Sequence, residues 1–333
     1  MRSNQSKATT RRLPSPLQKD RTGFPWQISE LPIFDDTRLP QLSIVVPSYQ
    51  QGRFLEETLR SILLQYHPKL ELIVIDGGST DETVSILEYY SPWIDYWVSE
   101  KDNGQSHAIN KGLKVATGDW LAFMNSDDGY LEGTFAHLFA QPLSVDFIYG
   151  NQGFVGKVRD DAQLRKTSNI HPLKLSGLLR FFRDVNYIIP SQSVFFSRAL
   201  LERVGYFDEA LHFGMDLDWY ARATLLNPTC IFNEFPTYFY RLDEHAKTAN
   251  YHWKGFYEVV GITKKYMTHL PYKEQERLLE EIAYDEVLRK VVAAKQIPDW
   301  RTFQEWLLSS PRVALRDRRF WGMLKKKLLA MSR

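Results

Sequence analysis

Two adjacent aspartates, Asp127 and Asp128, directly follow an apolar run of strand length in the stretch FMNSDDGYL. Neighbouring carboxylates repel each other, and burying them without a positive partner is costly. Mg²⁺ and Mn²⁺ take carboxylate oxygens and leave coordination positions for water and substrate phosphates. The pair therefore predicts a divalent metal site that meets a phosphorylated substrate. A second interpretation stays open, in which the two residues only begin a turn.

A second acidic pair lies downstream, where Asp216 and Asp218 open a helical pattern in the stretch YFDEALHFGMDLDWYARATLL. Carboxylates at the start of a helix cap its free N–H groups and favour its positive end. A carboxylate beside a substrate hydroxyl can instead accept the hydroxyl proton as a general base. Both roles are open from the residues alone.

Both pairs lie in a region that alternates short apolar runs with helical patterns from Leu42 onward. The apolar runs are LSIVVP, LELIVID, IDYWVS, DWLAFM and VDFIYG, and the helical segments are RFLEETLRSILLQY, DETVSILEYY, GQSHAINKGLKVA and LEGTFAHLFA. This alternation predicts a layered α/β domain with a largely parallel sheet. Ligands of such sheets bind beyond the carboxyl ends of the strands, where this chain places polar and glycine-rich residues. No GxGxxG or Walker-type phosphate loop follows a strand, which counts against a dinucleotide-binding fold and a P-loop NTPase.

Three blocks of the sequence, in this order, resemble the family 2 glycosyltransferases: SIVVPSYQQGRFLEETLRSILLQ, LELIVIDGGSTDET and DNGQSHAINKGLKVATGDWLAFMNSDDGY. The resemblance spans about residues 42 to 245. It implies the GT-A fold, a Rossmann-type domain with a mostly parallel sheet that binds nucleotide sugars. It also implies an inverting, metal-dependent transfer of a sugar from a UDP-, GDP- or dTDP-linked donor to a hydroxyl acceptor.

The resemblance assigns four residues to the nucleotide sugar. Pro47 and Tyr49 are expected to line the nucleoside pocket, and Asp76 is expected to bind the base or the ribose. Gln105 is expected to help hold the nucleotide. The chain departs from the family at Gly77, where a second Asp is common, and this departure leaves the base specificity open.

The resemblance also implies a site for the metal and the diphosphate. Asp127 and Asp128 are expected to form a DxD-like site for Mn²⁺ or Mg²⁺ and the diphosphate, with Asp127 also contacting the donor. The late block YRLDEHAKTA contains Arg241, His245 and Lys247, and the resemblance implies that these three residues reach the metal or the diphosphate. An ordinary surface role for His245 stays open.

The downstream acidic pair matches the family block that supplies the catalytic base. Met215 replaces the usual Glu of that block, and Asp216 takes the place of its Asp, so Asp216 is the expected base and Asp218 the reserve. Between the two acidic pairs, Gln192 and Ser193 match the acceptor side of the family. The same stretch, PSQSVFF, is equally typical of a core strand.

Length, composition and charge limit the remaining possibilities. The chain has 333 residues, of which 44% are hydrophobic, and a single cysteine, Cys230, so it can bury a large core and forms no internal disulfide. It contains neither the apolar block of a secretory signal near its first residue nor an apolar run of about 18 residues, which favours the cytoplasm. The net charge of +2 divides into +5 for residues 1–22, +7 for residues 311–333 and −10 for the body. The acidic body counts against broad nucleic-acid binding.

The sequence thus predicts a flexible lead over residues 1–40, a GT-A-like domain over 41–245 and a helical region with a basic tail over 246–333. We expect a glycosyltransferase that acts in cell-surface polysaccharide or glycolipid synthesis. The alternatives are a nucleotidyltransferase that makes sugar nucleotides and a nucleotide-sugar-binding protein without activity. The donor sugar, its base, the acceptor, the linkage and the oligomeric state are not encoded in these motifs.

The basic tail, PRVALRDRRFWGMLKKKLLAMSR, has apolar residues at near-helical spacing with Lys and Arg on the other sides. One interpretation is a helix that packs on the body and leaves its basic face in solvent. The other is an interfacial helix on anionic lipid, which would hold the protein at the inner face of a membrane near a lipid-linked acceptor.

Overall fold

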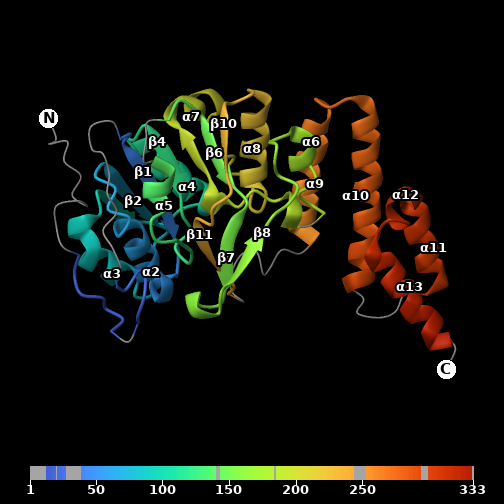
Figure 1. Cartoon of the computed structure of the whole chain (residues 1–333), viewed down its shortest axis with the longest axis horizontal. Coiled ribbons are helices and arrows are strands. Elements are labelled where there is room, and N and C mark those ends of the chain that lie inside the picture. Colours follow the sequence, from blue (N-terminus) through green and yellow to red (C-terminus); the bar gives the residue numbers. More distant parts are fainter. Residues whose placement is uncertain are drawn as a thin grey trace.

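A seven-stranded sheet forms the centre of the protein, in a computed structural model that describes residues 13–19, 21–27, 39–139, 143–183, 185–243, 253–293 and 299–331 (Figure 1). The strands, in spatial order, are β10 (Cys230–Asn233), β6 (Phe147–Gly150), β9 (Phe195–Ser197), β4 (Trp120–Phe123), β1 (Leu42–Ser48), β2 (Leu70–Asp76) and β3 (Tyr96–Ser99). Neighbouring strands are parallel except at β9, which runs antiparallel to β4 and β6. The expected α/β fold with a largely parallel sheet is confirmed.

Helices cover both faces of this sheet, which explains why its strands are nearly continuous apolar runs. Side chains alternate between the two faces along β1. Ile44 and Val46 pack with α2 (Gly52–Leu63), α3 (Thr83–Tyr90) and α5 (Thr134–Phe139) in one core. Val45 points to the other core, which contains α4 (Gln105–Val115) and α8 (Met215–Leu225). The shorter helices α6 (Leu175–Leu178) and α7 (Arg198–Val204) add to this second core.

A smaller sheet of four strands lies beside the main sheet. Its order is β5 (Gly129–Tyr130), β11 (Tyr238–Arg241), β7 (Gln152–Gly156) and β8 (Gln163–Lys166). The connection from β4 of the main sheet to β5 of the small sheet is the segment that contains Asp127 and Asp128. The acidic pair therefore lies where the chain passes from one sheet to the other.

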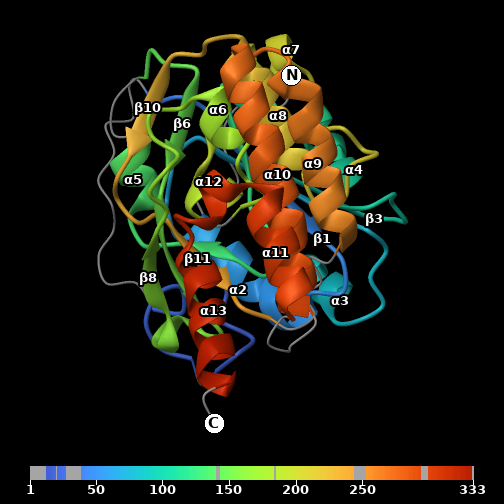
Figure 2. The ribbon, with the colours of Figure 1, turned by 90° about the vertical axis from the view of Figure 1, so that its right-hand side faces the viewer.

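The last part of the chain is helical, as the sequence predicts. It consists of α9 (Trp253–Met267), α10 (Tyr272–Ala293), α11 (Trp300–Ser309), α12 (Pro311–Ala314) and α13 (Arg318–Met331). Figure 2 shows α9 and α10 side by side and α13 extending past the other helices to the end of the chain. Across the described ranges, no helix is both long and apolar enough to span a membrane.

The buried core does not separate at residue 245. Phe256 and Val259 of α9, and Leu278 of α10, belong to the same core as α4 and α8. The second half of α10 instead packs with α11 and α13 in a separate cluster that contains Trp306 and Phe320. We therefore propose that the catalytic unit includes α9 and that the helical appendage begins within α10.

Candidate active site

Asp76 ends β2 and lies level with Ser48 of β1 and Ser99 of β3 in the parallel register. Its carboxylate is fully buried. It accepts hydrogen bonds from the N–H groups of Gly78 at 3.1 Å and Ser79 at 2.8 Å, and from the hydroxyls of Ser79 at 2.5 Å and Ser99 at 2.6 Å. These bonds fix the turn after the strand. The expected contact of Asp76 with the base or ribose stays a prediction.

Tyr49 lies on the rim just after β1, and its side chain is 62% exposed. A Cβ atom at Gly77 would lie 3.2 Å from Cδ2 of Tyr49 and 3.0 Å from Oδ2 of Asp102. A side chain at this position would therefore require Tyr49 or Asp102 to shift by a few tenths of an ångström. Pro47 is buried near the end of β1. The pairing of β1 with β4 ends at Val45, two residues before it. The exposed ring of Tyr49 is available to stack on a planar base.

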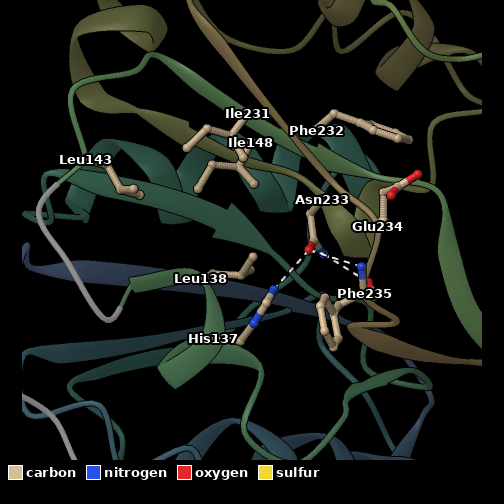
Figure 3. Close-up of a pocket in the computed structure, with 9 residues that line it drawn as sticks. All are labelled: His137, Leu138, Leu143, Ile148, Ile231, Phe232, Asn233, Glu234 and Phe235. Carbon is tan, nitrogen blue, oxygen red and sulfur yellow. Dashed lines mark hydrogen bonds between the residues drawn. The ribbon is translucent and has the colours of Figure 1, made fainter.

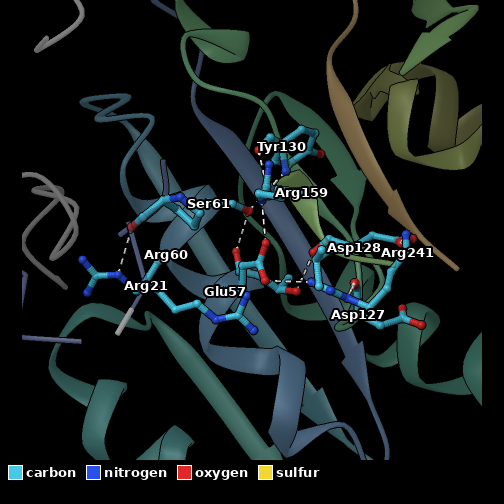
Figure 4. Close-up of polar contacts among 12 residues, drawn as sticks. Arg21, Glu57, Arg60, Ser61, Asp127, Asp128, Tyr130, Arg159 and Arg241 are labelled. Atoms are coloured by element: carbon cyan, nitrogen blue, oxygen red, sulfur yellow. Dashed lines mark hydrogen bonds and ion pairs between the residues drawn. The ribbon is translucent and has the colours of Figure 1, made fainter. Parts of the chain in front are cut away.

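Asp128 is buried, with only 3% of its surface exposed. One carboxylate oxygen accepts the N–H of Arg241 at 2.9 Å (Figure 4). The other accepts the amides of Gln192 at 2.6 Å and Asn125 at 3.4 Å. Burial, reinforced by the charge of Asp127, raises the pKa of Asp128 to about 8. Burial also raises the pKa of Asp127, which keeps part of its surface exposed. The polar surroundings therefore compensate the charge of this pair only in part.

A buried ion network lies directly behind the acidic pair, as Figure 4 shows. Glu57 of α2 pairs with Arg241 at 2.7 Å through one carboxylate oxygen and with Arg159 at 2.5 Å through the other. Arg241 also donates to the backbone carbonyl of Asp127 at 2.9 Å, and its guanidinium lies 4.3 Å from the ring centre of Phe54. The resemblance to the family predicts that Arg241 reaches the metal or the diphosphate. The structure instead commits its guanidinium to Glu57 and to backbone carbonyls, so that it holds the turn.

The start of α4 connects the acidic pair with the helix that carries Asp216. Gln105 donates to the side-chain oxygen of Asn125 at 2.7 Å. The next residue, Ser106, has its hydroxyl 2.8 Å from the sulfur of Met215, the first residue of α8. Two consecutive residues of one helix therefore contact the two segments that the sequence singles out. The expected contact of Gln105 with a nucleotide stays a prediction.

The two aspartates of α8 have different surroundings. Asp218 is only 1% exposed and accepts bonds from Tyr266 at 2.8 Å, Arg222 at 2.9 Å and Lys265 at 3.0 Å. Burial opposes its ionisation, but these hydrogen bonds outweigh burial and lower the pKa of Asp218. Asp216 is partly exposed in the first turn of the helix. This geometry favours Asp216 over Asp218 as the group that meets a substrate hydroxyl.

The acidic pair suits a divalent cation, although it does not by itself complete a metal site. Within the ranges that the structure describes, no three His, Cys, Asp or Glu side chains come together to hold a metal ion. The third expected ligand, His245, lies outside those ranges. The donors at Asp127 and Asp128 are carboxylate oxygens, which Mg²⁺ and Mn²⁺ prefer. Their raised pKa values indicate a site that a positive charge would stabilise.

Comparisons with known proteins show the family of this chain. The sequence model described as Glycosyl transferase family 2 matches residues 43–205. An uncharacterised glycosyltransferase of Mycobacterium tuberculosis is 31% identical over 212 residues, which cover 60% of this chain and 77% of the relative. The chain belongs to glycosyl transferase family 2. It is therefore a glycosyltransferase, as the sequence predicts.

Two further similarities extend over more of this glycosyltransferase. A PGL/p-HBAD biosynthesis glycosyltransferase of Mycobacterium bovis is 26% identical over 278 residues, which cover 79% of this chain and 98% of the relative. The mannosyltransferase PcManGT from Pyrobaculum calidifontis, solved in complex with GDP-Man and Mn²⁺, matches with a TM-score of 0.52 at 19% identity. That match covers 89% of this chain and 87% of the other. At this identity it shows the shared fold, and the GT-A-like fold is confirmed.

Sequence reasoning missed the residue of the glycosyltransferase that holds the loop before α8. The carboxylate of Glu258, on α9, accepts the N–H groups of His212 at 3.0 Å, Phe213 at 2.6 Å and Gly214 at 2.7 Å. This loop leads directly into Asp216. An isolated Glu in an amphipathic helix carries no sequence signal for such a role. The same is true of Glu57 in α2.

The acceptor-side candidates of the glycosyltransferase are both engaged inside the protein. Gln192 binds Asp128, as described above. The hydroxyl of Ser193 lies 2.7 Å from the carbonyl of Pro190 and within 3.2 Å of the backbone of Gly150. The stretch that follows forms β9 in the core, as the core-strand interpretation of this segment predicts. Contact with an acceptor stays a prediction for both residues.

A cavity of about 560 Å³ lies apart from these residues, between α5 and the edge strand β10 (Figure 3). Its apolar lining includes Leu138, Ile148 and Ile231, and its polar lining includes His137, whose ring nitrogen lies 3.2 Å from Asn233. None of the predicted site residues lines it. The candidate active site of the glycosyltransferase is therefore defined by the strand ends and not by this hollow.

Proposed function

We propose that this enzyme transfers a sugar from a nucleotide-diphosphate donor to a hydroxyl acceptor, with inversion at the anomeric carbon and with Mn²⁺ or Mg²⁺ bound. The observation that carries the proposal is the convergence at the start of α4. Gln105 contacts the segment of the acidic pair, and Ser106 contacts the segment that leads to Asp216. The segments proposed to bind the diphosphate and to carry the proton acceptor are thus both contacted by one helix.

Each group then has a chemical role. Tyr49 offers an exposed ring for the nucleoside, two residues after the buried Pro47, and Asp76 holds the turn after β2. Asp127 and Asp128 would hold the cation, which supplies a Lewis acid for the leaving diphosphate. Asp216 takes the proton of the acceptor hydroxyl as that oxygen attacks the anomeric carbon. Attack on the face opposite the leaving group gives inversion.

The proposed donor and cofactor classes follow the fold. A structure of the same fold binds GDP-Man and Mn²⁺. We propose a UDP-, GDP- or dTDP-linked sugar as the donor of this enzyme. We also propose a role in cell-surface polysaccharide or glycolipid synthesis, in the cytoplasm. One relative is named for PGL/p-HBAD biosynthesis. The family assignment decides against the nucleotidyltransferase alternative.

A panel of UDP-, GDP- and dTDP-linked sugars tests the proposal by thermal shift and donor hydrolysis, with Mn²⁺ or with a chelator. We expect one donor class to raise the melting temperature and to be hydrolysed only with the cation present. Asp127→Asn should abolish the hydrolysis that the cation supports. Asp160→Asn, the same change at an exposed carboxylate, should leave it intact. Hydrolysis that is unchanged in chelator would refute the metal role, and a product with retained anomeric configuration would refute inversion.

A further inference from the structure

Helix α13 has two sides with different surroundings. Phe320 is only 4% exposed and packs in the cluster of α10 and α11, with Met323 and Leu324 against the same cluster. Trp321 and Leu328, seven residues apart and so on one side of the helix, are 47% and 53% exposed. Packing on the body, the first of the two interpretations of the tail, therefore accounts for only one side of α13.

The exposed apolar strip continues beyond the helix. Leu315, just after α12, is 54% exposed, and its carbonyl accepts the indole N–H of Trp321 at 3.0 Å. This bond places Leu315 beside the tryptophan. Trp321 has thereby satisfied its polar group within the protein and presents the rest of its ring to the outside.

Basic residues surround this strip. Arg316, Arg318, Lys325 and Lys326 are exposed on and before α13. The segment from residue 311 to 333 carries a net charge of +7, whereas the body between the two basic ends carries −10. Figure 2 shows that the end of α13 reaches past the other helices.

We infer that the tail patch, formed by Leu315, Trp321, Leu328 and the surrounding basic residues, docks on an anionic lipid surface. Basic residues are attracted to anionic headgroups, while the tryptophan ring and leucines enter the boundary with the acyl chains. The acidic body is repelled by the same surface, which disfavours contact through the body. An apolar strip of this kind is not needed for binding to a phosphate backbone, which charge alone supports.

This docking deepens the proposed function, because it selects a lipid-linked hydroxyl acceptor presented at the same surface. It rests on the proposed function only for that acceptor. Lipid binding itself is measured without donor, so its failure is distinguishable from a failure of the sugar-transfer assignment.

The test is sedimentation of the full chain with vesicles of phosphatidylglycerol and phosphatidylcholine, against vesicles of phosphatidylcholine alone, at low salt. We expect binding to the anionic vesicles only. Lys325→Gln/Lys326→Gln should reduce the partition coefficient about 30-fold, which corresponds to ~1 kcal/mol for each charge. Trp321→Ser/Leu328→Ser should also reduce it. Donor hydrolysis should remain unchanged in both.

The matched control is Lys254→Gln/Lys264→Gln, which removes the same charge from exposed positions on α9. We expect this variant to bind as the parent does. Circular dichroism confirms that each variant is folded. Equal losses in the two lysine variants would show that charge acts without a defined patch, and would overturn the inference. Equal binding to neutral vesicles, or binding to an oligonucleotide without binding to vesicles, would overturn it too.

Discussion

Exchanging each aspartate of α8 for asparagine separates a proton acceptor from a structural anchor. Asparagine keeps the size of aspartate and cannot take the hydroxyl proton. Asp216 is partly exposed at the start of the helix, whereas Asp218 is buried with three donors around it. The same substitution should therefore reduce activity at one position and stability at the other.

The expected magnitudes follow from these contacts. Asp216→Asn should lower kcat by about 10² to 10⁴, the scale of general-base catalysis. Its cost in stability should not exceed about 1 kcal/mol, the value of a carboxylate near a helix N-terminus. Asp218→Asn removes a buried carboxylate that pairs with the partly exposed guanidinium of Arg222, and should cost about 3 kcal/mol. Lys265 adds little to this figure, because its side chain is 58% exposed and solvent screens the pair.

Three measurements decide the outcome: kcat for sugar transfer, the calorimetric affinity for the donor nucleotide, and the melting temperature. For Asp216→Asn we expect a loss of kcat with donor affinity and melting temperature retained. For Asp218→Asn we expect a lower melting temperature, and a much smaller loss of kcat than for Asp216→Asn at a temperature where the variant is folded. The reasoning is refuted if Asp216→Asn keeps full kcat, or if it loses donor affinity in proportion to activity.

Three further outcomes are expected. Glu258→Gln weakens the three bonds to the loop before α8, so kcat should fall about tenfold or more with unchanged donor affinity, because a small displacement of a catalytic group is costly. Glu57→Gln breaks two buried ion pairs and should lower the free energy of unfolding by about 3–5 kcal/mol in urea titrations. Burial lowers the pKa of His67 from 6.5 to about 4, so its stabilising contribution is present above pH 6.5 and lost as the pH falls toward 4. His67→Gln should shrink the difference in unfolding free energy between pH 7 and pH 5 by about 2 kcal/mol; an unchanged difference would contradict the assignment.

The main sheet was predictable from the sequence because its strands are buried on both faces. Continuous apolar runs such as LSIVVP have no other stable location, and their parallel alignment brings their last residues to one rim. Asp76 and the acidic pair could therefore be assigned to the same edge of the sheet before their side chains were placed. The antiparallel strand β9 was less predictable, since its three residues, Phe195–Ser197, are too few for periodicity to indicate a strand.

The ion network behind the acidic pair could not be predicted from local patterns. Glu57 meets Arg241 across 184 positions of sequence and Arg159 across 102. A charged residue in a helix normally indicates a face in solvent, and nothing in the segment around Glu57 marks it as buried. Such pairings are set by how the two sheets come together. The sequence thus points to candidate groups for the chemistry more readily than to the groups that would hold them in place.

The helix α9 shows this difference most clearly. The resemblance to the family assigns no role to any residue of α9. This helix nevertheless holds the helix of Asp216 at two points. Glu258 holds the loop before α8, while Lys265 and Tyr266 hold Asp218 one turn further on. Between these contacts the two helices approach so closely that a Cβ at Gly214 would lie 2.5 Å from Ile262. The orientation of the proposed base is therefore set by residues on both sides of the boundary predicted at residue 245, because α9 packs against α8 as part of one core.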